Sequence, residues 1–380
     1  MLYNIKQNMR NSIIDRTKCP VLDVFHAKTV WFFDINREGV EKMKKLTKKS
    51  IVLGAAMALT LFTLACGDGG GGGGGGGGSS GGGGSAPQWT VVTDSTFGSD
   101  RIYAIAYGNN TFVAGGDKGK MATSTDGKTW TAVTNSPFPN NDAFTNNRIY
   151  AIAYGNNTFV AGIGQKKATS TDGKIWTAGS DTSGFSVIAY GNGKFVASIG
   201  QKTVISTDGK IWTTGSDIIF GTGDYIEAIA YGNSKFVAGS SKGKVKTSTD
   251  GTTWTTETDS TLSSIYAIAY GKGKFVAVGG NYRNNKIATS TDGVTWTAVD
   301  ISSISTYGDY YIEGIAYGNG KFVVGDGDGS IITSTDGVKW TATNRIFGSG
   351  FNRSISVIAY GNGTFVAGSY EGRIAYLSGN

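Results

Sequence analysis

The segment Ile-Ala-Tyr-Gly occurs seven times along this chain, and each copy opens a unit with the same internal order. A short turn, an apolar run, a Ser-Thr-Asp-Gly turn and a Trp-Thr pair follow it in most units. The spacings between the tyrosines are 47, 36, 41, 39, 47 and 43 residues, and the tyrosines are Tyr107, Tyr154, Tyr190, Tyr231, Tyr270, Tyr317 and Tyr360. Repeats of about 40 to 50 residues are typical of β-propeller blades.

Each unit reads as four short strands. In the first unit the predicted strands cover residues 102–107, 111–115, 120–124 and 129–133. They are rich in β-branched and aromatic residues, and Asn, Asp and Gly turns separate them, which is typical of β-hairpins. No segment after residue 86 shows a helical period, so we expect an all-β domain.

The first strand of each unit predicts how neighbouring blades pack. In residues 102–107, one isoleucine and two alanines alternate with two tyrosines and a second isoleucine. Neighbouring blades cover both faces of an inner strand in a propeller. We therefore expect the large face of one blade to pack on the small face of the next.

The two ends of the repeat region are incomplete in complementary ways. The seventh unit ends with residues 373–380, which align with a third strand and lack a fourth. Trp89-Thr90 matches a fourth strand with no earlier strands before it. We infer that this N-terminal strand completes the last blade, because closure removes the open sheet edges. The prediction is an all-β, seven-bladed β-propeller of four-stranded blades over residues 89–380.

The six Ser-Thr-Asp-Gly-x-x-Trp turns resemble the Asp-box, or BNR-like repeat, of bacterial sialidase-like propellers. In that family a Ser, an Asp, a Gly and an aromatic residue mark the hairpin between the third and fourth strands. A residue usually separates the Asp from the Gly, whereas here the two are adjacent. The resemblance implies a propeller fold and a structural role for these turns, placed away from the catalytic face. The aspartates are Asp126, Asp172, Asp208, Asp250, Asp292 and Asp336.

The part before the propeller predicts export and anchoring. Residues 43–65 combine a basic segment with an apolar run, 51–64, that is short for a membrane span, and Cys66 follows directly. This pattern resembles a bacterial lipoprotein signal, with Thr63 where leucine is usual, and an uncleaved signal anchor is the alternative. The resemblance implies lipidation at Cys66 and attachment to a bacterial membrane, as an outer-membrane or cell-surface protein. We interpret residues 1–42 as an upstream extension assigned in error.

Residues 66–88 carry the cysteine and a glycine- and serine-rich stretch, which predicts a flexible tether. A phosphate-binding loop would need a preceding strand, a following helix and a Lys-Ser/Thr pair, and none is present.

Charge does not favour nucleic acid as a partner. Residues 1–65 hold 11 of the 35 basic and 5 of the 28 acidic residues, which leaves a nearly neutral remainder. The predicted contact with the membrane is therefore through the lipid anchor only.

The residue types that are missing exclude several chemistries. The single histidine is His26, and the two cysteines are Cys19 and Cys66, so the propeller contains neither residue type. A Ser-His-Asp triad, a disulfide and a zinc or copper site built from His and Cys are excluded there. Residues 326–330 contain two aspartates but lack the later glutamate of a calcium loop, and we interpret them as a turn. We expect no cofactor and no metal.

Candidate site residues lie where the repeats differ. The connections between blades vary in length and are long at residues 135–147, 300–311 and 344–354. Variable loops on a rigid scaffold often carry function. We expect a channel mouth with guanidinium groups on one side, carboxylates on the other and tyrosines between. The candidate ligand-binding residues are Arg101, Tyr103, Arg148, Tyr150, Glu227, Tyr266, Glu313 and Arg353, with Ser186 and Ser356 at equivalent positions and Asp224 and Asp309 nearby.

Three classes of function can use this arrangement. A non-catalytic module would bind a protein or a glycan through the loop-rich face, with the arginines on an acidic group. The family resemblance implies instead a sialidase-like hydrolase, in which three arginines hold the substrate carboxylate while a Tyr–Glu pair and an Asp do the chemistry. Against it, the Phe-Arg-Ile-Pro motif of sialidases is absent and the sequence assigns no Tyr–Glu pair. A structural or assembly propeller is the third class, and the binding module is the preferred interpretation.

Overall fold

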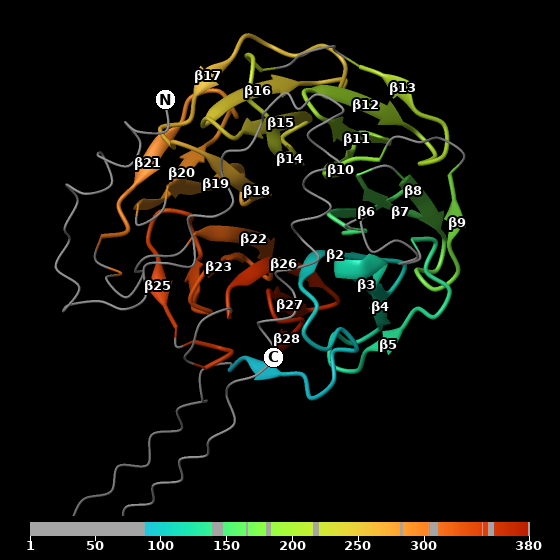
Figure 1. The fold of residues 1–380 in the computed structure, drawn as a ribbon. Coiled ribbons are helices and arrows are strands. Elements are labelled where there is room, and N and C mark those ends of the chain that lie inside the picture. The colour runs from blue at the N-terminus through green and yellow to red at the C-terminus, as the bar shows by residue number, and fades with distance from the viewer. Residues whose placement is uncertain are drawn as a thin grey trace, which may run out of the picture. The chain divides into compact units, whose positions relative to one another are not determined.

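Seven antiparallel four-stranded sheets form a closed ring in the computed structural model (Figure 1). The structure describes residues 88–138, 147–164, 166–179, 184–215, 220–281, 284–302, 304, 311–343, 345–348 and 353–378. The predicted seven-bladed propeller is therefore confirmed. The predicted signal, Cys66 and nearly all of the tether lie outside the described residues. No described helix has the length and apolar character needed to span a membrane.

The innermost strands carry the Ile-Ala-Tyr-Gly segments. They are β2 (Ile102–Gly108), β6 (Ala151–Gly155), β10 (Val187–Gly191), β14 (Ile226–Gly232), β18 (Ile265–Gly271), β22 (Ile312–Gly318) and β26 (Ile355–Gly361). The second strands hold the buried Phe-Val runs. They are β3 (Thr111–Gly116), β7 (Thr158–Ile163), β11 (Lys194–Ile199), β15 (Lys235–Ser240), β19 (Lys274–Asn281), β23 (Lys321–Asp326) and β27 (Thr364–Ser369).

The third strands lead into the Ser-Thr-Asp-Gly turns in six blades. They are β4 (Met121–Ser124), β8 (Lys166–Ser170), β12 (Lys202–Ser206), β16 (Lys244–Ser248), β20 (Asn284–Ser290), β24 (Ile331–Ser334) and β28 (Ile374–Ser378). A 3-10 turn, η1 (Asp117–Gly119), precedes β4. The outermost strands are only two or three residues long. They are β5 (Thr131–Ala132), β9 (Thr177–Ala178), β13 (Thr213–Thr214), β17 (Thr258–Asp259), β21 (Thr297–Val299), β25 (Thr341–Ala342) and β1 (Thr90–Val91).

The ring closes through the N-terminal strand, as the sequence predicts. Strand β1 pairs antiparallel with β28, with Thr90 opposite Tyr376 and Val91 opposite Ala375. Figure 1 shows β1 at the rim of the sheet that holds the C-terminal strands. Trp89, just before β1, packs against the buried cluster between the sixth and seventh blades. The seventh blade therefore reaches four strands only with a segment from the other end of the domain.

The repeated Tyr-Gly pair has a steric explanation. Each glycine lies under the tyrosine ring of the next blade, so that a Cβ atom there would overlap the ring. The contact runs from Gly108 with Tyr154 around the ring to Gly361 with Tyr107, which closes the cycle. Only glycine permits so close an approach of ring to backbone. The Tyr and Gly of the Ile-Ala-Tyr-Gly repeat thus form the contact between neighbouring blades.

A β-bulge near the start of the inner strand changes the predicted alternation. In five blades the register with the second strand shifts by one residue, as between Ile102 and Ala104 in β2. Ile102 therefore joins Ile105 and Tyr107 in the cluster shared with the seventh blade, while Ala104 packs toward the second. The large-on-small packing holds, but the strict alternation was wrong at Ile102, because a bulge inserts one extra residue.

The Ser-Thr-Asp-Gly turns are closed by one hydrogen-bond pattern. In the fifth blade Asp292 Oδ1 accepts bonds from the amides of Val294 and Thr295, each at 2.8 Å, and from Ser290 Oγ at 2.9 Å. These amide bonds lower the pKa of Asp292 to about 2. Gly293 has a φ of 76°, which favours glycine. The aspartates are thus engaged by their own turns, which supports a structural role.

Candidate functional site

The bulges place one side chain of the inner strand in the central channel in each of five blades. The extra residues are Tyr103, Glu227, Tyr266, Glu313 and Ser356, and all five line a pocket of about 370 Å³. The pocket lies where the inner strands begin. In the second and third blades, β6 and β10 begin one residue after Tyr150 and Ser186, which do not line it. Bulges often re-aim side chains at functional sites.

Arg101 joins the two sides of this pocket in an ion pair. Its Nη2 atom lies 2.6 Å from Glu313 Oε2, although the two residues belong to the first and sixth blades. Tyr370, from the seventh blade between them, donates a hydrogen bond to Glu313 Oε1, and its ring lies 3.4 Å from Arg101 Cζ. Burial and the Glu313 charge raise the pKa of Tyr370. The guanidinium and the carboxylate thus neutralise each other at the channel mouth.

The other two predicted arginines do not line the pocket. Arg148 Nε lies 3.1 Å from Asp117 Oδ1, and Arg353 donates a hydrogen bond to the carbonyl oxygen of Phe347. The structure therefore does not bring the three guanidinium groups together in this pocket, although ring closure makes their blades neighbours. Asp309 lies outside the described residues. Whether these residues bind a ligand stays a prediction.

Tyr103 is held at the mouth by polar and aromatic neighbours. Its hydroxyl donates a hydrogen bond to Asp117 Oδ1 at 3.1 Å, and its ring meets Tyr150 edge-on at 5.2 Å between centroids. Burial, followed by the charge of Asp117, raises the pKa of Tyr103 to about 12. A phenol with this pKa stays protonated at neutral pH, and because its single proton is donated to Asp117, it presents its aromatic face to a ligand.

The carboxylate of Glu227 differs from that of Glu313. No described residue forms a hydrogen bond or an ion pair with Glu227, which is the exposed residue of β14. It lies in the channel among the walls of the pocket, and this enclosure, followed by the charge of Asp224, raises its pKa. Glu227 therefore contributes a negative charge that the described residues leave uncompensated.

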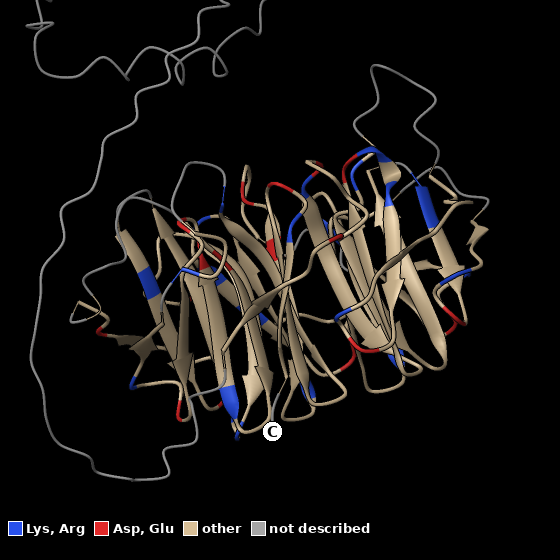
Figure 2. Cartoon of the chain, turned by 90° about the horizontal axis from the view of Figure 1, so that it is seen from below, with Lys and Arg blue, Asp and Glu red and all other residues tan. Residues whose placement is uncertain are grey.

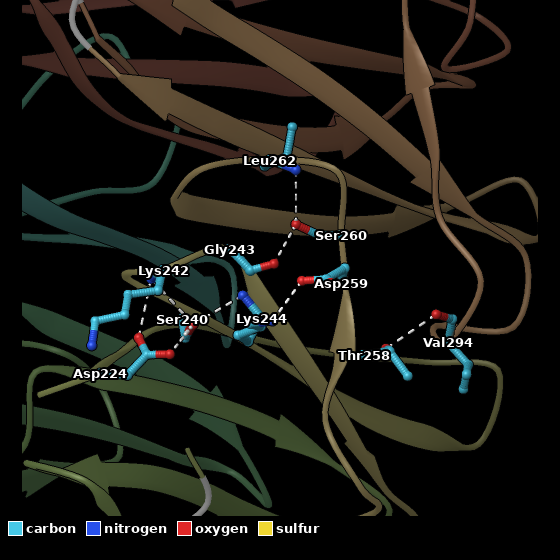
Figure 3. A network of polar contacts seen from close by, with 10 residues as sticks. All are labelled: Asp224, Ser240, Lys242, Gly243, Lys244, Thr258, Asp259, Ser260, Leu262 and Val294. Atoms are coloured by element: carbon cyan, nitrogen blue, oxygen red, sulfur yellow. Dashed lines mark hydrogen bonds and ion pairs between the residues drawn. The ribbon is translucent and has the colours of Figure 1, made fainter. Parts of the chain in front are cut away.

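Asp224 is a structural anchor for the neighbouring loop (Figure 3). Its carboxylate accepts hydrogen bonds from Ser240 Oγ and Ser241 Oγ, each at 2.9 Å, and from the Lys242 amide at 3.0 Å. Only 3% of its surface is exposed. Lys244 Nζ lies 2.7 Å from Asp259 Oδ1, and Figure 3 draws this ion pair as well. Asp224 thus fixes the loop between β15 and β16, and Glu227 is the carboxylate of this blade that lines the pocket.

Tyr266 provides an aromatic wall of the pocket. Its hydroxyl donates to the Gly280 carbonyl oxygen at 3.1 Å, and its ring meets that of Tyr311 nearly perpendicular at 5.6 Å. Burial raises the pKa of Tyr266, so it too stays protonated at neutral pH. Its fixed ring and the accessible Glu227 carboxylate line the same pocket.

Sequence reasoning missed Asp117 and Tyr370. Both directly follow a second strand, β3 and β27, and these loops share a face with the starts of the inner strands. The signal was available, since Gly164, Gly200 and Ser241 stand at the equivalent position in other blades. Tyr370 and Glu313 also form a Tyr–Glu pair that the sequence did not assign. The partners come from different blades, which only the closed ring brings together.

Charged residues gather mainly at the ends of the strands on both faces of the propeller (Figure 2). Among the described residues, no three His, Cys, Asp or Glu side chains lie in an arrangement that could hold a metal ion. A groove of about 640 Å³ runs between the second and third blades, lined mainly by Thr, Ala, Gly, Ile and Lys residues. The channel mouth is the better candidate site, because it combines aromatic rings with an uncompensated charge.

These features define a seven-bladed β-propeller with a polar and aromatic pocket at one end of its channel. YCF48 from Cyanidioschyzon merolae is similar in fold, with 17% identity, a TM-score of 0.58 and coverage of 77% of this chain and 99% of that chain. YCF48 bound to D1 peptide matches at 16% identity and a TM-score of 0.57, over 77% and 96% of the two chains. Virginiamycin B lyase from Staphylococcus aureus matches at 13% identity and a TM-score of 0.62, over 78% and 99%.

At these identities the likeness concerns the fold alone. No protein-family model matches the sequence, and no curated protein matches it.

Proposed function

We propose that this protein is a non-catalytic binding module that holds a segment of a partner protein at the loop-rich end of its channel. The pocket at that end carries the proposal, because fixed tyrosine rings and an accessible carboxylate converge there on a rigid ring. YCF48, whose fold is similar, has been observed bound to D1 peptide, which supports a protein segment over a glycan as the ligand.

The composition of the propeller also favours binding over lyase chemistry. A virginiamycin B lyase variant in which alanine replaces a histidine is catalytically inactive. The propeller of this chain contains no histidine, since His26 is the only one in the sequence. Proteins of unrelated function share this fold, so the residues of the pocket, and not the fold, indicate the function.

Peptide and glycan arrays probed with the purified full chain test this proposal. We expect binding to peptides, and we expect Tyr103→Ser combined with Tyr266→Ser, which changes the two tyrosines of the pocket, to abolish it. A matched control combines Ile175→Ser with Ile211→Ser, because these side chains are 77% and 75% exposed on turns at the opposite face. Loss of binding in the control alone, or binding to glycans alone, would contradict the proposal.

The sialidase-like alternative retains one supporting observation, the hydrogen bond between Tyr370 and Glu313. Only Arg101 of the three candidate arginines lines the pocket, and Glu313 already pairs with it. A fluorogenic sialoside measures the activity directly. We expect no turnover, whereas turnover that Glu313→Gln abolishes with folding intact would establish the hydrolase.

We further propose that the protein is exported and anchored to a bacterial membrane through a lipid on Cys66, at the outer membrane or cell surface. The basic segment and apolar run of residues 43–65, directly before the cysteine, support this. Cells fed a radiolabelled fatty acid should label the protein, and Cys66→Ala should abolish the label and release the protein from membranes. Unchanged membrane retention of the variant would favour an uncleaved signal anchor.

A further inference from the structure

We propose that the channel-mouth pocket binds a protonated amine or guanidinium, the side chain of a lysine or arginine on the partner segment, with Glu227 as its counter-ion. This inference rests on the proposed function and names the chemistry of its ligand. It reverses the charge that the sequence predicts for the ligand, since three neighbouring arginines suggested an anion.

The charge balance of the pocket carries the argument. Its charged lining residues are Arg101, Glu227 and Glu313, and the ion pair at 2.6 Å neutralises the first with the last. Glu227 remains, and no described residue pairs with it. Burial in the pocket, followed by the negative charge of the nearby Asp224, raises the pKa of Glu227. An incoming cation relieves this uncompensated charge, whereas a carboxylate meets repulsion and must compete with Glu313 for Arg101.

The neighbouring cations that the structure describes leave this position open. Lys242 directs its Nζ atom to the Thr222 carbonyl oxygen at 3.1 Å, and Lys244 pairs with Asp259. Arg148 and Arg353 are engaged outside the pocket by Asp117 and by the Phe347 carbonyl oxygen. None of these side chains lines the pocket with Glu227.

The aromatic lining suits the same ligand. Tyr103 and Tyr266 both line the pocket, and hydrogen bonds to Asp117 and to the Gly280 carbonyl oxygen hold their hydroxyl groups. Rings fixed in this way can contact the stem of a Lys or Arg side chain and attract its charged end through a cation–π interaction. The pocket volume of about 370 Å³ accommodates one such side chain.

The test measures the binding of acetyl-Gly-Gly-X-Gly-Gly-amide peptides to the full chain by titration calorimetry and saturation-transfer NMR, with X as Lys, Arg, norleucine or Glu. We expect the Lys and Arg peptides to bind at least about tenfold more tightly than the norleucine and Glu peptides. Glu227→Gln should remove this preference, and Tyr266→Leu should weaken binding more than Tyr266→Phe. Glu257→Gln, an exposed change in the same blade, is the matched control and should have no effect.

Equal binding of the Lys peptide to Glu227→Gln and to the unmodified chain would overturn the inference. A preference for the Glu peptide that Arg101→Gln abolishes would also overturn it and restore the anionic ligand. If an array-selected partner binds the loop-rich face with an affinity unaffected by Glu227→Gln, the inference fails while the proposed function stands. If the Lys peptide binds as expected but no partner protein depends on this face, the proposed function fails while the cation site stands.

Discussion

At the scale of single residues, the Tyr-Gly pair shows how a repeated motif encodes contact between blades. Each glycine is needed because the tyrosine ring of the next blade occupies the space of its Cβ atom. The tyrosine and glycine of one motif are adjacent in sequence, but the contact joins the glycine of one repeat to the tyrosine of the next. Substitution of one glycine should therefore act through the neighbouring blade.

We expect Gly232→Ala to lower the free energy of unfolding by at least about 1–3 kcal/mol, the usual cost of overpacking. The added methyl group would overlap the Tyr270 ring. Gly164→Ala is the control, because nothing lies within 4 Å of its Cβ position. Urea denaturation measures both, and the Gly232→Ala, Tyr270→Ala double variant should be more stable than the sum of the single effects predicts. Equal effects at Gly232 and Gly164 would contradict this explanation.

Asp326 in the sixth blade predicts a distinct pH dependence. Burial, followed by the neighbouring Asp328, raises its pKa from 3.8 to about 8. The folded chain therefore holds this proton more tightly than the unfolded chain. The stabilisation from Asp326 is fully present below about pH 4 and is lost as the pH rises toward 8.

Asp326→Asn should imitate the protonated acid, since its amide can donate to Asp328 while its oxygen accepts the same backbone bonds. Relative to the unmodified chain, the variant should gain stability with rising pH, by up to about 1.4 kcal/mol per pH unit between pH 4 and 8. Asp292→Asn is the control, because the pKa of Asp292 is lowered to about 2 and its contribution changes only below about pH 4. Denaturation at pH values from 4 to 9 gives the free energy of unfolding. The prediction is refuted if this free energy varies with pH in the same way in the unmodified chain, Asp326→Asn and Asp292→Asn.

At the scale of the elements, the inner strands and the N-terminal strand have different structural roles. The bulge in five of the inner strands turns one side chain into the channel, while the rest of the strand packs between blades. Strand β1 contributes only two residues to its sheet, but it covers the edge of β28 and brings Trp89 to the core. Its loss would expose that edge.

Deletion of residues 86–94 should lower the free energy of unfolding by several kcal/mol, because it removes the pairing with β28 and the packing of Trp89. Deletion of residues 70–78, nine consecutive glycines, is a control of equal length and should have no such effect. Chemical denaturation measures stability, and light scattering measures self-association through the exposed edge. If the two deletions give the same melting curve, β1 does not close the ring.

At the scale of the whole molecule, the ion pair between Arg101 and Glu313 connects blades that are not neighbours. It passes over the seventh blade, which is the blade that needs both ends of the domain, and Tyr370 of that blade contacts both partners. Both side chains are 23% exposed, so the pair is shielded from water more than a surface salt bridge. The ion pair thus connects the pocket to the seventh blade, in which the ring closes.

We expect Arg101→Gln to lower the free energy of unfolding by about 1–2 kcal/mol, because it leaves Glu313 without its cation. A double-mutant cycle with Glu313→Gln should give a coupling energy of at least about 0.5 kcal/mol. The same cycle on Lys244 and Asp259, which lie in one blade and are 34% and 79% exposed, should give a smaller value. A coupling no larger than that of this surface pair would argue against a role in closure.

The sequence by itself determined the repeat, the four strands per blade, the number of blades and the closure by β1. These follow from local turn chemistry and from counting, as with the six Asp-Gly turns and the unmatched Trp89. It also placed Tyr103, Glu227, Tyr266 and Glu313 at the start of inner strands, and these line one pocket. Local patterns suffice for such features because they depend on residues close together in the chain.

The tertiary structure alone decided which of these residues act together. A one-residue bulge in the inner strand moved Ile102 to the opposite face and turned Tyr103 into the channel. Arg101 met Glu313 from 212 residues away, and Arg148 and Arg353 were engaged elsewhere, so Glu227 was left as the uncompensated charge. The physical reason is that register and ion pairing depend on partners in other blades, and only the closed ring sets their distances.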